Sequence, residues 1–168
     1  MRSERFKALI FVALVAFSAC AAAVLAARRL VWNQTPSVPR GLYLRRASTG
    51  VAVGSMVVFA VPASVRSLVR ERRYLPPGAT LMKRVVAMPG DRVCLDGETY
   101  VVNERPIARV RIADSRGRSL PVFRFCGQVP PGRAFVATSA PLSFDSRYFG
   151  PVPLETLTVV TPLWTFSR

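Results

Sequence analysis

Residues 81–91 read Leu-Met-Lys-Arg-Val-Val-Ala-Met-Pro-Gly-Asp and give the clearest single indication of the chain's architecture. Their β-branched and apolar residues end at a Pro-Gly pair, which predicts a strand followed by a turn. Because side chains alternate along a strand, one face of it carries Leu81, Lys83, Val85 and Ala87. Burial would disfavour the ammonium form of Lys83, and bringing its pKa from about 10.4 towards neutrality costs roughly 4 kcal/mol. The alternative is a lysine whose stem packs while its ammonium reaches water.

Lysine is scarce in this chain. Of 24 Lys and Arg residues only Lys7 and Lys83 are lysines. Arginine can replace lysine for nearly any surface charge, whereas a guanidinium does not give up its proton in a protein. The pattern therefore indicates a need for an amine at position 83. There is also no histidine, which excludes a Ser-His-Asp triad, a Cys-His dyad and a His-ligated zinc ion.

Short Val-rich runs separated by Pro and Gly surround this strand, a pattern typical of antiparallel β structure. The predicted strands are residues 51–60, 81–88, 92–95, 99–103, 133–138 and 157–161. Asp96-Gly97 predicts a hairpin turn between two of them. Residues 63–73 have apolar positions at helical spacing and predict one short helix. The fold class is therefore mainly β.

The N-terminal region predicts a membrane segment. Residues 8–27 contain no charge and as a helix would span roughly 30 Å, the thickness of a bilayer core. Residues 1–7 form a positive region expected on the cytoplasmic side. The charge rule alone does not settle this orientation, because arginines also follow the segment at positions 28, 29, 40, 45 and 46. Ala-x-Ala triplets would permit cleavage of a signal sequence, but the length favours a retained anchor. Residues 17–20 are a poor lipoprotein box because Phe replaces the usual aliphatic residue, so lipidation of Cys20 is not expected.

The formal charge of +15 would suit nucleic acid or an anionic membrane surface as a neighbour. The arginines are spread along the chain, with the densest group at residues 70–73, so nucleic-acid binding is not expected. Cys94 and Cys126 both fall in the predicted β region. In an exported domain we expect them to pair, with a stabilisation of roughly 3 kcal/mol on the chain-entropy model. The alternative is two buried free cysteines.

Two further segments are polar and rich in turn residues. Residues 33–43 read Asn-Gln-Thr-Pro-Ser-Val-Pro-Arg-Gly-Leu-Tyr, and the prolines hold Ser37 in an extended strand or turn. Residues 141–152 contain Asp145 and Arg147, which are placed to pair and order a loop. Ser143 in the same segment could hydrogen-bond a neutral lysine amine. Taken alone, each segment also suits an ordinary turn.

The order of these three segments resembles the signal peptidase I superfamily. The features are a serine soon after the membrane, then Lys-Arg-Val-Val-x-x-Pro-Gly-Asp, then Ser-x-Asp-Ser-Arg-x-x-Gly-x-Val. Within the superfamily, residues 37–43, the two cysteines and residues 143–152 resemble the TraF branch of conjugative-transfer peptidases. The likeness covers nearly the whole chain and implies a signal-peptidase-like antiparallel β domain behind an N-terminal transmembrane helix.

The resemblance also implies roles for particular residues. Ser37, Lys83 and Asp145 match the catalytic residues of the family: nucleophile, general base and the acidic residue of the third segment. The supporting positions are Ser143, which would orient the lysine, and Arg147, which would brace the segment. Thr35 stands where signal peptidase I carries a hydroxyl that helps its oxyanion hole.

The chain departs from general signal peptidases in ways that favour the TraF branch. Val38 replaces the usual Met, the large second domain of some bacterial enzymes is absent, and one membrane segment precedes the serine. Asn103-Glu104 replaces an Asn-Gly turn common in the family, which should affect only a hairpin.

The expected protein is a serine endopeptidase of the bacterial inner membrane that needs no metal or cofactor. Residues 28–168 would form a catalytic domain on the periplasmic face. Its partners would be a membrane-inserted pilin or other signal-peptide-bearing precursor, the inner membrane and other channel proteins of conjugation. In part of the TraF branch the substrate's own amino group resolves the acyl-enzyme and gives a circular pilin. Two alternatives stay open: a general signal peptidase that acts by hydrolysis, and a non-catalytic membrane-tethered β domain of a transfer channel.

Overall fold

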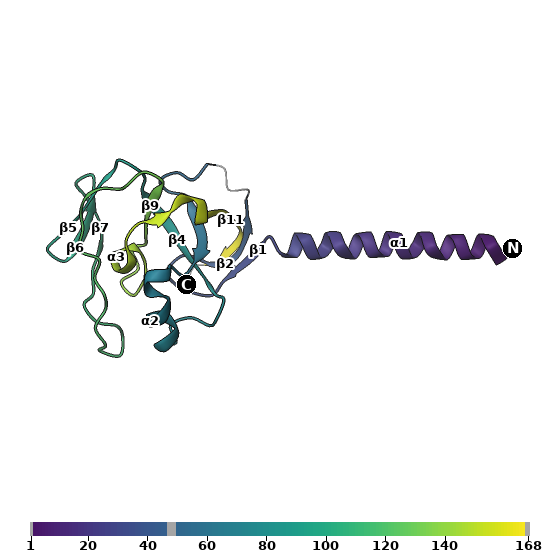
Figure 1. The fold of residues 1–168 in the computed structure, drawn as a ribbon, viewed down its shortest axis with the longest axis horizontal. Helices are drawn as coiled ribbons and strands as arrows, with labels where there is room; N and C mark the ends of the chain where they lie inside the picture. Colours follow the sequence, from purple (N-terminus) through teal and green to yellow (C-terminus); the bar gives the residue numbers. More distant parts are fainter. Residues whose placement is uncertain (1, 47–49, 167–168) are drawn as a thin grey trace.

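The apolar N-terminal segment forms one long helix that stands apart from the rest of the protein (Figure 1). The computed structural model describes residues 2–46 and 50–166. In it, α1 (Arg2–Ala27) includes a stretch, Leu9–Ala27, that is long and apolar enough to cross a membrane and has no part buried against the protein. A helix with apolar side chains exposed on all sides is typical of a membrane span or a signal sequence.

The remainder of the chain forms two antiparallel sheets, which confirms the predicted mainly β fold. The larger sheet has the order β1-β2-β11-β3-β4-β9-β10 and the smaller one β7-β6-β5-β8. The strands of the larger sheet are β1 (Leu30–Asn33), β2 (Arg40–Arg45), β3 (Met56–Ala60), β4 (Thr80–Ala87), β9 (Arg133–Ala137), β10 (Val152–Pro153) and β11 (Thr158–Phe166). Those of the smaller sheet are β5 (Arg92–Asp96), β6 (Thr99–Val102), β7 (Arg105–Arg109) and β8 (Cys126–Gln128).

Short helical turns complete the domain. The predicted helix at residues 63–73 is a 3-10 turn, η1 (Ala63–Val65), followed by α2 (Arg66–Glu71), and Arg73 ends it with a positive φ of 53°. The other two are α3 (Ser146–Phe149) and η2 (Leu154–Thr156). The predicted strand at 51–60 begins only at Met56, because residues 51–55 form a turn that includes Gly54 at φ 91°.

Strand β4 lies in the interior of the larger sheet, between β3 and β9. Both of its faces are covered, since Leu81 and Val85 enter one apolar core and Met82 enters another. Lys83 lies between Leu81 and Val85 on the same face of the strand, as the sequence predicted. Its side chain is therefore carried by one of the most enclosed strands of the domain.

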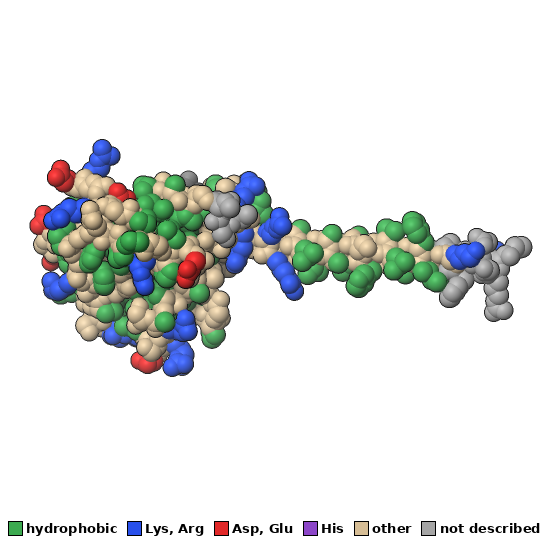
Figure 2. Space-filling view, turned by 45° about the horizontal axis from the view of Figure 1, so that its top comes forward, with side chains coloured by type: hydrophobic (Ala, Val, Ile, Leu, Met, Phe, Trp, Pro, Cys, Tyr) green, Lys and Arg blue, Asp and Glu red, His purple; other side chains and the backbone are tan. Residues whose placement is uncertain are grey.

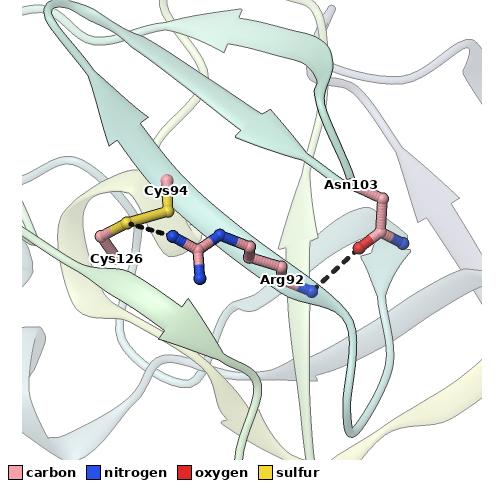
Figure 3. Close-up of a disulfide and its surroundings, with 4 residues drawn as sticks. All are labelled: Arg92, Cys94, Asn103 and Cys126. Carbon is pink, nitrogen blue, oxygen red and sulfur yellow. Dashed lines mark hydrogen bonds between the residues drawn. A yellow bond between two sulfur atoms is a disulfide. The ribbon is translucent and has the colours of Figure 1, made fainter.

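The smaller sheet contains the predicted hairpin and the predicted disulfide. Asp96 pairs with Thr99 across a turn in which Gly97 has a φ of 56°. Cys94 of β5 and Cys126 of β8 are opposite one another in the sheet and are disulfide-bonded (Figure 3). The alternative of two free cysteines is thus excluded in this structure.

Asn103 and Glu104 form the turn of the β6–β7 hairpin, as expected, with φ angles of 45° and 67°. Asn103 also accepts a hydrogen bond from the Arg92 backbone N–H at 2.9 Å (Figure 3). The substitution of glutamate for the glycine of an Asn-Gly turn is therefore accommodated within the hairpin.

Candidate active site

Ser37 lies in the turn that joins β1 to β2, beyond the strand pair Asn33–Gly41. Proline residues at 36 and 39 restrict the backbone on both sides of it. Val38, next to the serine, is buried in the core that also contains Tyr43 and Met82. This buried side chain holds the turn against the sheet and leaves Ser37 half-buried at the surface of a cleft.

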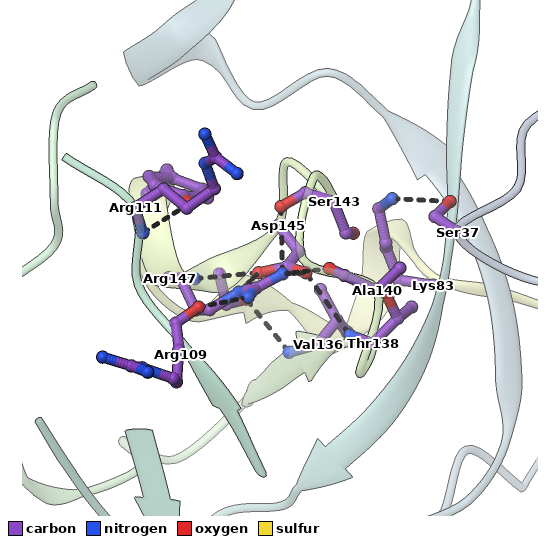
Figure 4. A network of polar contacts seen from close by, with 12 residues as sticks. Ser37, Lys83, Arg109, Arg111, Val136, Thr138, Ala140, Ser143, Asp145 and Arg147 are labelled. Atoms are coloured by element: carbon purple, nitrogen blue, oxygen red, sulfur yellow. Dashed lines mark hydrogen bonds and ion pairs between the residues drawn. The ribbon is translucent and has the colours of Figure 1, made fainter. Parts of the chain in front are cut away.

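Lys83 reaches this serine from the middle of β4. Its Nζ donates a hydrogen bond to Ser37 Oγ at 3.1 Å (Figure 4), although the two residues are 46 positions apart in the chain. The lysine is only 4% exposed. Burial lowers its pKa from 10.5 to about 8, the negative charge of Asp145 opposes that change, and the positive charge of Arg147 adds to it. The amine therefore titrates close to neutral pH.

Thr35 and Ser143 line the same cleft as this pair. Thr35 Oγ1 is 3.3 Å from Ser37 Oγ. The Ser143 hydroxyl is buried and has no hydrogen-bond partner among the described residues. The hydrogen bond expected between Ser143 and Lys83 is thus not formed in this structure, and the roles assigned to the two hydroxyls stay predictions.

Asp145 and Arg147 form a fully buried ion pair next to the Ser37–Lys83 pair (Figure 4). Nε and one terminal nitrogen of Arg147 each donate at 2.8 Å to a different oxygen of Asp145. Asp145 also caps α3 by accepting from the Arg147 backbone N–H. The guanidinium further binds the carbonyl oxygens of Arg109, Ala140 and Ser143. The pair therefore joins β7, α3 and the segment after β9.

Ser37 is hydrogen-bonded to Lys83, whereas the Asp145–Arg147 ion pair affects the lysine through charge. Within the described chain, Asp145 makes no hydrogen bond or ion pair with Lys83, so it acts on the amine only through its charge. Burial tends to lower the pKa of Arg147, but the hydrogen bonds and charge of Asp145 outweigh it and raise that pKa. The buried Arg147 guanidinium is thus held in its charged form by Asp145.

The cleft that contains Ser37 and Lys83 has a volume of about 530 Å³. Residues 111–120 form one wall of the cleft. Hydrogen bonds to the Asp114 carboxylate connect this wall to the segment after α2. Tyr74 donates its hydroxyl to Asp114, and Arg118 Nε donates to the same carboxylate at 2.7 Å. Much of the remaining lining is apolar: Val58, Leu81, Met82, Leu142, Phe144 and Tyr148. Such a cleft suits an extended peptide with apolar side chains.

Sequence reasoning did not single out Asn33. This residue ends β1, is 6% exposed, and hydrogen-bonds the backbone of the turn that carries Ser37. The available signal was an amide at the end of the apolar run Leu-Val-Trp, directly before a proline-containing turn. Short polar side chains at such positions often bond to the neighbouring backbone.

Residues 2–164 match the family of signal peptidases, peptidase S26, and the chain belongs to this family. Its relatives include conjugal transfer protein TraF of Agrobacterium tumefaciens (strain 15955), which is 36% identical over 156 residues that cover 87% of each chain. A plasmid transfer protein TraF of Escherichia coli is 35% identical over 147 residues, covering 80% of this chain and 82% of that protein. The predicted resemblance to TraF-type peptidases is confirmed.

A solved structure of signal peptidase I from Enterococcus faecalis V583 is 22% identical and has a TM-score of 0.42. It covers 67% of this chain and 98% of the signal peptidase chain.

Proposed function

We propose that this chain is a membrane-anchored serine endopeptidase in which Ser37 is the nucleophile and Lys83 the general base. The observation that supports the proposal is the 3.1 Å contact between Lys83 Nζ and Ser37 Oγ in a site where the lysine is almost fully buried. With a pKa of about 8, about a tenth of the molecules carry a neutral amine at pH 7. This fraction is sufficient for a base that must also return its proton.

The reaction begins when neutral Lys83 takes the proton of the Ser37 hydroxyl as Oγ bonds to the scissile carbonyl carbon. The carbonyl π electrons move to oxygen and form a tetrahedral oxyanion. As the C–N bond breaks, the Lys83 ammonium gives its proton to the departing amine. The product is an ester between Ser37 and the N-terminal part of the substrate.

The oxyanion requires donors that are not already used. In the part of the chain that the structure describes, the Ser37 backbone N–H donates to no other group. It is therefore available to the developing negative charge. The family resemblance implies Thr35 as a second donor, but its hydroxyl proton is donated to Asn33 Oδ1 at 2.8 Å in this structure.

Asp145, Arg147 and Ser143 act as positioning residues in this proposal. The buried ion pair fixes the segment that follows β9, and this segment carries Ser143 into the cleft. The Ser143 hydroxyl, which lacks a partner among the described residues, is then available to the Lys83 amine when a substrate closes the site.

The similarity to TraF proteins of conjugal transfer supports a membrane-inserted precursor as the substrate, with a conjugative pilin subunit as the first candidate. Ser37 lies ten residues beyond the end of α1, which limits its distance from the helix end to about 35 Å. We therefore propose inner-membrane attachment by α1, a periplasmic catalytic domain and cleavage close to the bilayer. Either water or an amino group of the substrate resolves the ester, again with Lys83 as base.

The test is an assay of membranes that contain the wild type, Ser37→Ala, Lys83→Arg or Lys83→Ala with a tagged pilin precursor. Lys83→Arg keeps the charge but not the base, because a guanidinium remains protonated. Ser67→Ala serves as the matched control, since Ser67 is an exposed serine on α2. We expect cleavage only by the wild type and the control.

Cleavage by Ser37→Ala or Lys83→Arg at the wild-type rate would reject this mechanism. Mass spectrometry of the product then separates the two acceptors. A linear product that has gained the mass of water indicates hydrolysis, and a product without it indicates a circular pilin.

A further inference from the structure

The side chain of Asn33 makes hydrogen bonds throughout the turn that contains Ser37. Its Nδ2 donates to the carbonyl oxygens of Thr35, Val38 and Pro39 at 3.0, 3.1 and 3.0 Å. Its Oδ1 accepts from the Thr35 backbone N–H at 3.1 Å and from the Thr35 hydroxyl at 2.8 Å. One buried amide thus contacts both sides of the turn, before and after the serine.

These contacts fix the orientation of the amide. An amide oxygen only accepts and an amide NH₂ group only donates. Rotating the Asn33 amide by half a turn would place its oxygen against three carbonyl oxygens and its nitrogen against a backbone N–H. The observed orientation is therefore the one that the surrounding backbone permits, and Oδ1 is held towards Thr35.

The fixed oxygen determines the direction of the neighbouring hydroxyl. Thr35 has a single hydroxyl proton, and that proton is donated to Asn33 Oδ1. Only lone pairs of Thr35 Oγ1 then face Ser37 Oγ at 3.3 Å. Ser37 Oγ consequently lies between an amine at 3.1 Å and a hydroxyl oxygen that acts as an acceptor.

We infer that Asn33 is a positioning residue that makes Thr35 an acceptor for the Ser37 hydroxyl and so sets the direction of the nucleophile. The inference rests on the proposed function of Ser37 and Lys83. It also assigns Thr35 a task other than that of an oxyanion donor, because its proton is committed to Asn33.

The arrangement orders the proton transfers around Ser37. When Lys83 is an ammonium ion, it donates to Ser37 Oγ and the serine proton points to Thr35. When Lys83 is neutral, its lone pair accepts a hydrogen bond from the Ser37 hydroxyl, and Ser37 Oγ stays in contact with the amine. The change of Lys83 from ammonium ion to amine releases one proton to the solvent, and the Ser37 proton changes its acceptor from Thr35 to Lys83. The Thr35–Asn33 hydrogen bond is the same in both states.

The experiment compares kcat and KM for the precursor in wild type, Asn33→Ala, Thr35→Val, Thr35→Ser and the double variant Asn33→Ala/Thr35→Val. A misplaced nucleophile costs about 100-fold in rate, so we expect kcat to fall about that much in both disruptive single variants, with little change in KM. If Asn33 acts through the Thr35 hydroxyl, the double variant is no slower than the slower single variant. Thr35→Ser keeps the hydroxyl and should retain most of the rate.

The matched control is Asn103→Ala. Asn103 also bonds backbone and side-chain groups of a turn, but it lies in the β6–β7 hairpin. This variant should lower the melting temperature and leave kcat per folded molecule unchanged. If Asn33→Ala behaves in the same way, or if its effect and that of Thr35→Val multiply in the double variant, the inference is wrong.

Two outcomes separate this inference from the proposed function. Cleavage by Ser37→Ala would overturn the proposed function itself. An inactive Ser37→Ala together with a fully active Asn33→Ala would overturn only the role of Asn33. If Asn33→Ala does not fold, Thr35→Val is the deciding variant, because it leaves the three hydrogen bonds from the Asn33 amide to backbone carbonyls intact. A lower kcat at an unchanged melting temperature supports the inference. An unchanged kcat contradicts it.

Discussion

If Lys83 is the base, as we propose, it meets two opposing physical requirements. A base needs a neutral amine at the working pH, and burial provides this by disfavouring the ammonium ion. The same burial makes the ammonium form costly to fold, and nearby Asp145 offsets only part of that cost. Activity and stability should therefore respond in opposite directions to changes at this residue.

The first prediction concerns the pH dependence of cleavage. In the proposed mechanism the attack on the substrate requires neutral Lys83, so kcat/KM should rise with pH, reach half its maximum near pH 8 and level off above it. The measurement is kcat/KM between about pH 6 and 10. An activity that is constant or falls across this range would contradict a lysine base.

The second prediction concerns stability. The folded pKa of Lys83, about 8, is lower than its ordinary value of 10.5, so the unfolded state binds more protons between these two pH values. The resulting penalty is complete below pH 8, amounts to about 3 kcal/mol, and is relieved as pH rises to 10.5. Lys83→Met should therefore be more stable than the wild type at pH 7, by an amount that shrinks towards pH 10.5.

Denaturant unfolding at several pH values measures this difference. Arg84→Met is the control, because Arg84 is the next residue on β4 but has an exposed side chain. A Lys83→Met variant that is less stable than the wild type at pH 7 would show that the buried ammonium ion does not lower the free energy of unfolding.

The third prediction concerns the buried ion pair. Asp145→Ala leaves the Arg147 guanidinium buried without its partner, which typically costs about 3–5 kcal/mol of folding free energy. Glu98→Ala breaks an ion pair with Arg109 that lies at the surface, where the Arg109 side chain is 77% exposed and the Glu98 side chain 68% exposed. This change should cost under about 1 kcal/mol of folding free energy. Equal losses in the two variants, measured by denaturant unfolding, would contradict the structural role of the pair.

At the scale of elements, the predictable parts of the fold are those with a strong local pattern. The strands at 92–95, 99–103 and 133–138 agree with β5, β6 and β9 within one residue at either end. Strand β2 was not predicted, because a glycine interrupts its short alternating pattern. The predicted strand at 157–161 continues to Phe166, where a register shift near Pro162 allows β11 to remain paired with β2.

The glycine in β2 supplies the fourth prediction. Gly41 has a φ of 147°, and a β-carbon there would lie 2.1 Å from the Trp164 carbonyl oxygen of β11. Gly41→Ala should therefore separate β2 from β11 and displace the adjoining Ser37 turn, with loss of both stability and cleavage. Gly54→Ala is the control, because Gly54 also has a positive φ but has no atom within 4 Å of such a β-carbon.

The backbone strain of a non-glycine residue at positive φ costs about 1–3 kcal/mol. Gly54→Ala should lose about that amount and keep its activity. If thermal unfolding gives the same loss for both variants, the close approach of β2 and β11 does not explain the glycine at position 41.

At the scale of the molecule, the sequence predicted an anchor, a β domain and a buried lysine, but local patterns could not bring Ser37 and Lys83 together. That pairing came from the resemblance to a family, because strands β2 and β3 and the helical turns η1 and α2 separate the two residues along the chain. Asn33 and the wall at residues 111–120 were missed for the same reason. Their roles depend on contacts between distant segments and leave no periodic signal.

The surface where α1 meets the β domain is the remaining feature at this scale. Figure 1 shows β1, β2 and β11 on the side of the domain nearest α1, and Figure 2 shows basic side chains gathered at the junction. The chain's two tryptophans, Trp32 on β1 and Trp164 on β11, are both exposed there, with ring centroids 6.3 Å apart and Phe166 beside them. Tryptophan favours the boundary between lipid and water, and arginine favours anionic headgroups.

The fifth prediction is that these tryptophans contact lipid when α1 spans a bilayer. Full-length protein in liposomes that contain phosphatidylglycerol should lose tryptophan fluorescence when the lipids carry bromine near the headgroup, and iodide in the water should quench it only weakly. Trp32→Phe and Trp164→Phe each leave one tryptophan. Comparing how strongly the brominated lipid quenches the two variants shows whether β1 or β11 lies deeper in the bilayer. Strong quenching by iodide and none by the brominated lipid would mean that the domain stands away from the membrane. Because Trp32 also lines the cleft, lipid contact at this residue would open the cleft directly towards a precursor that emerges from the bilayer.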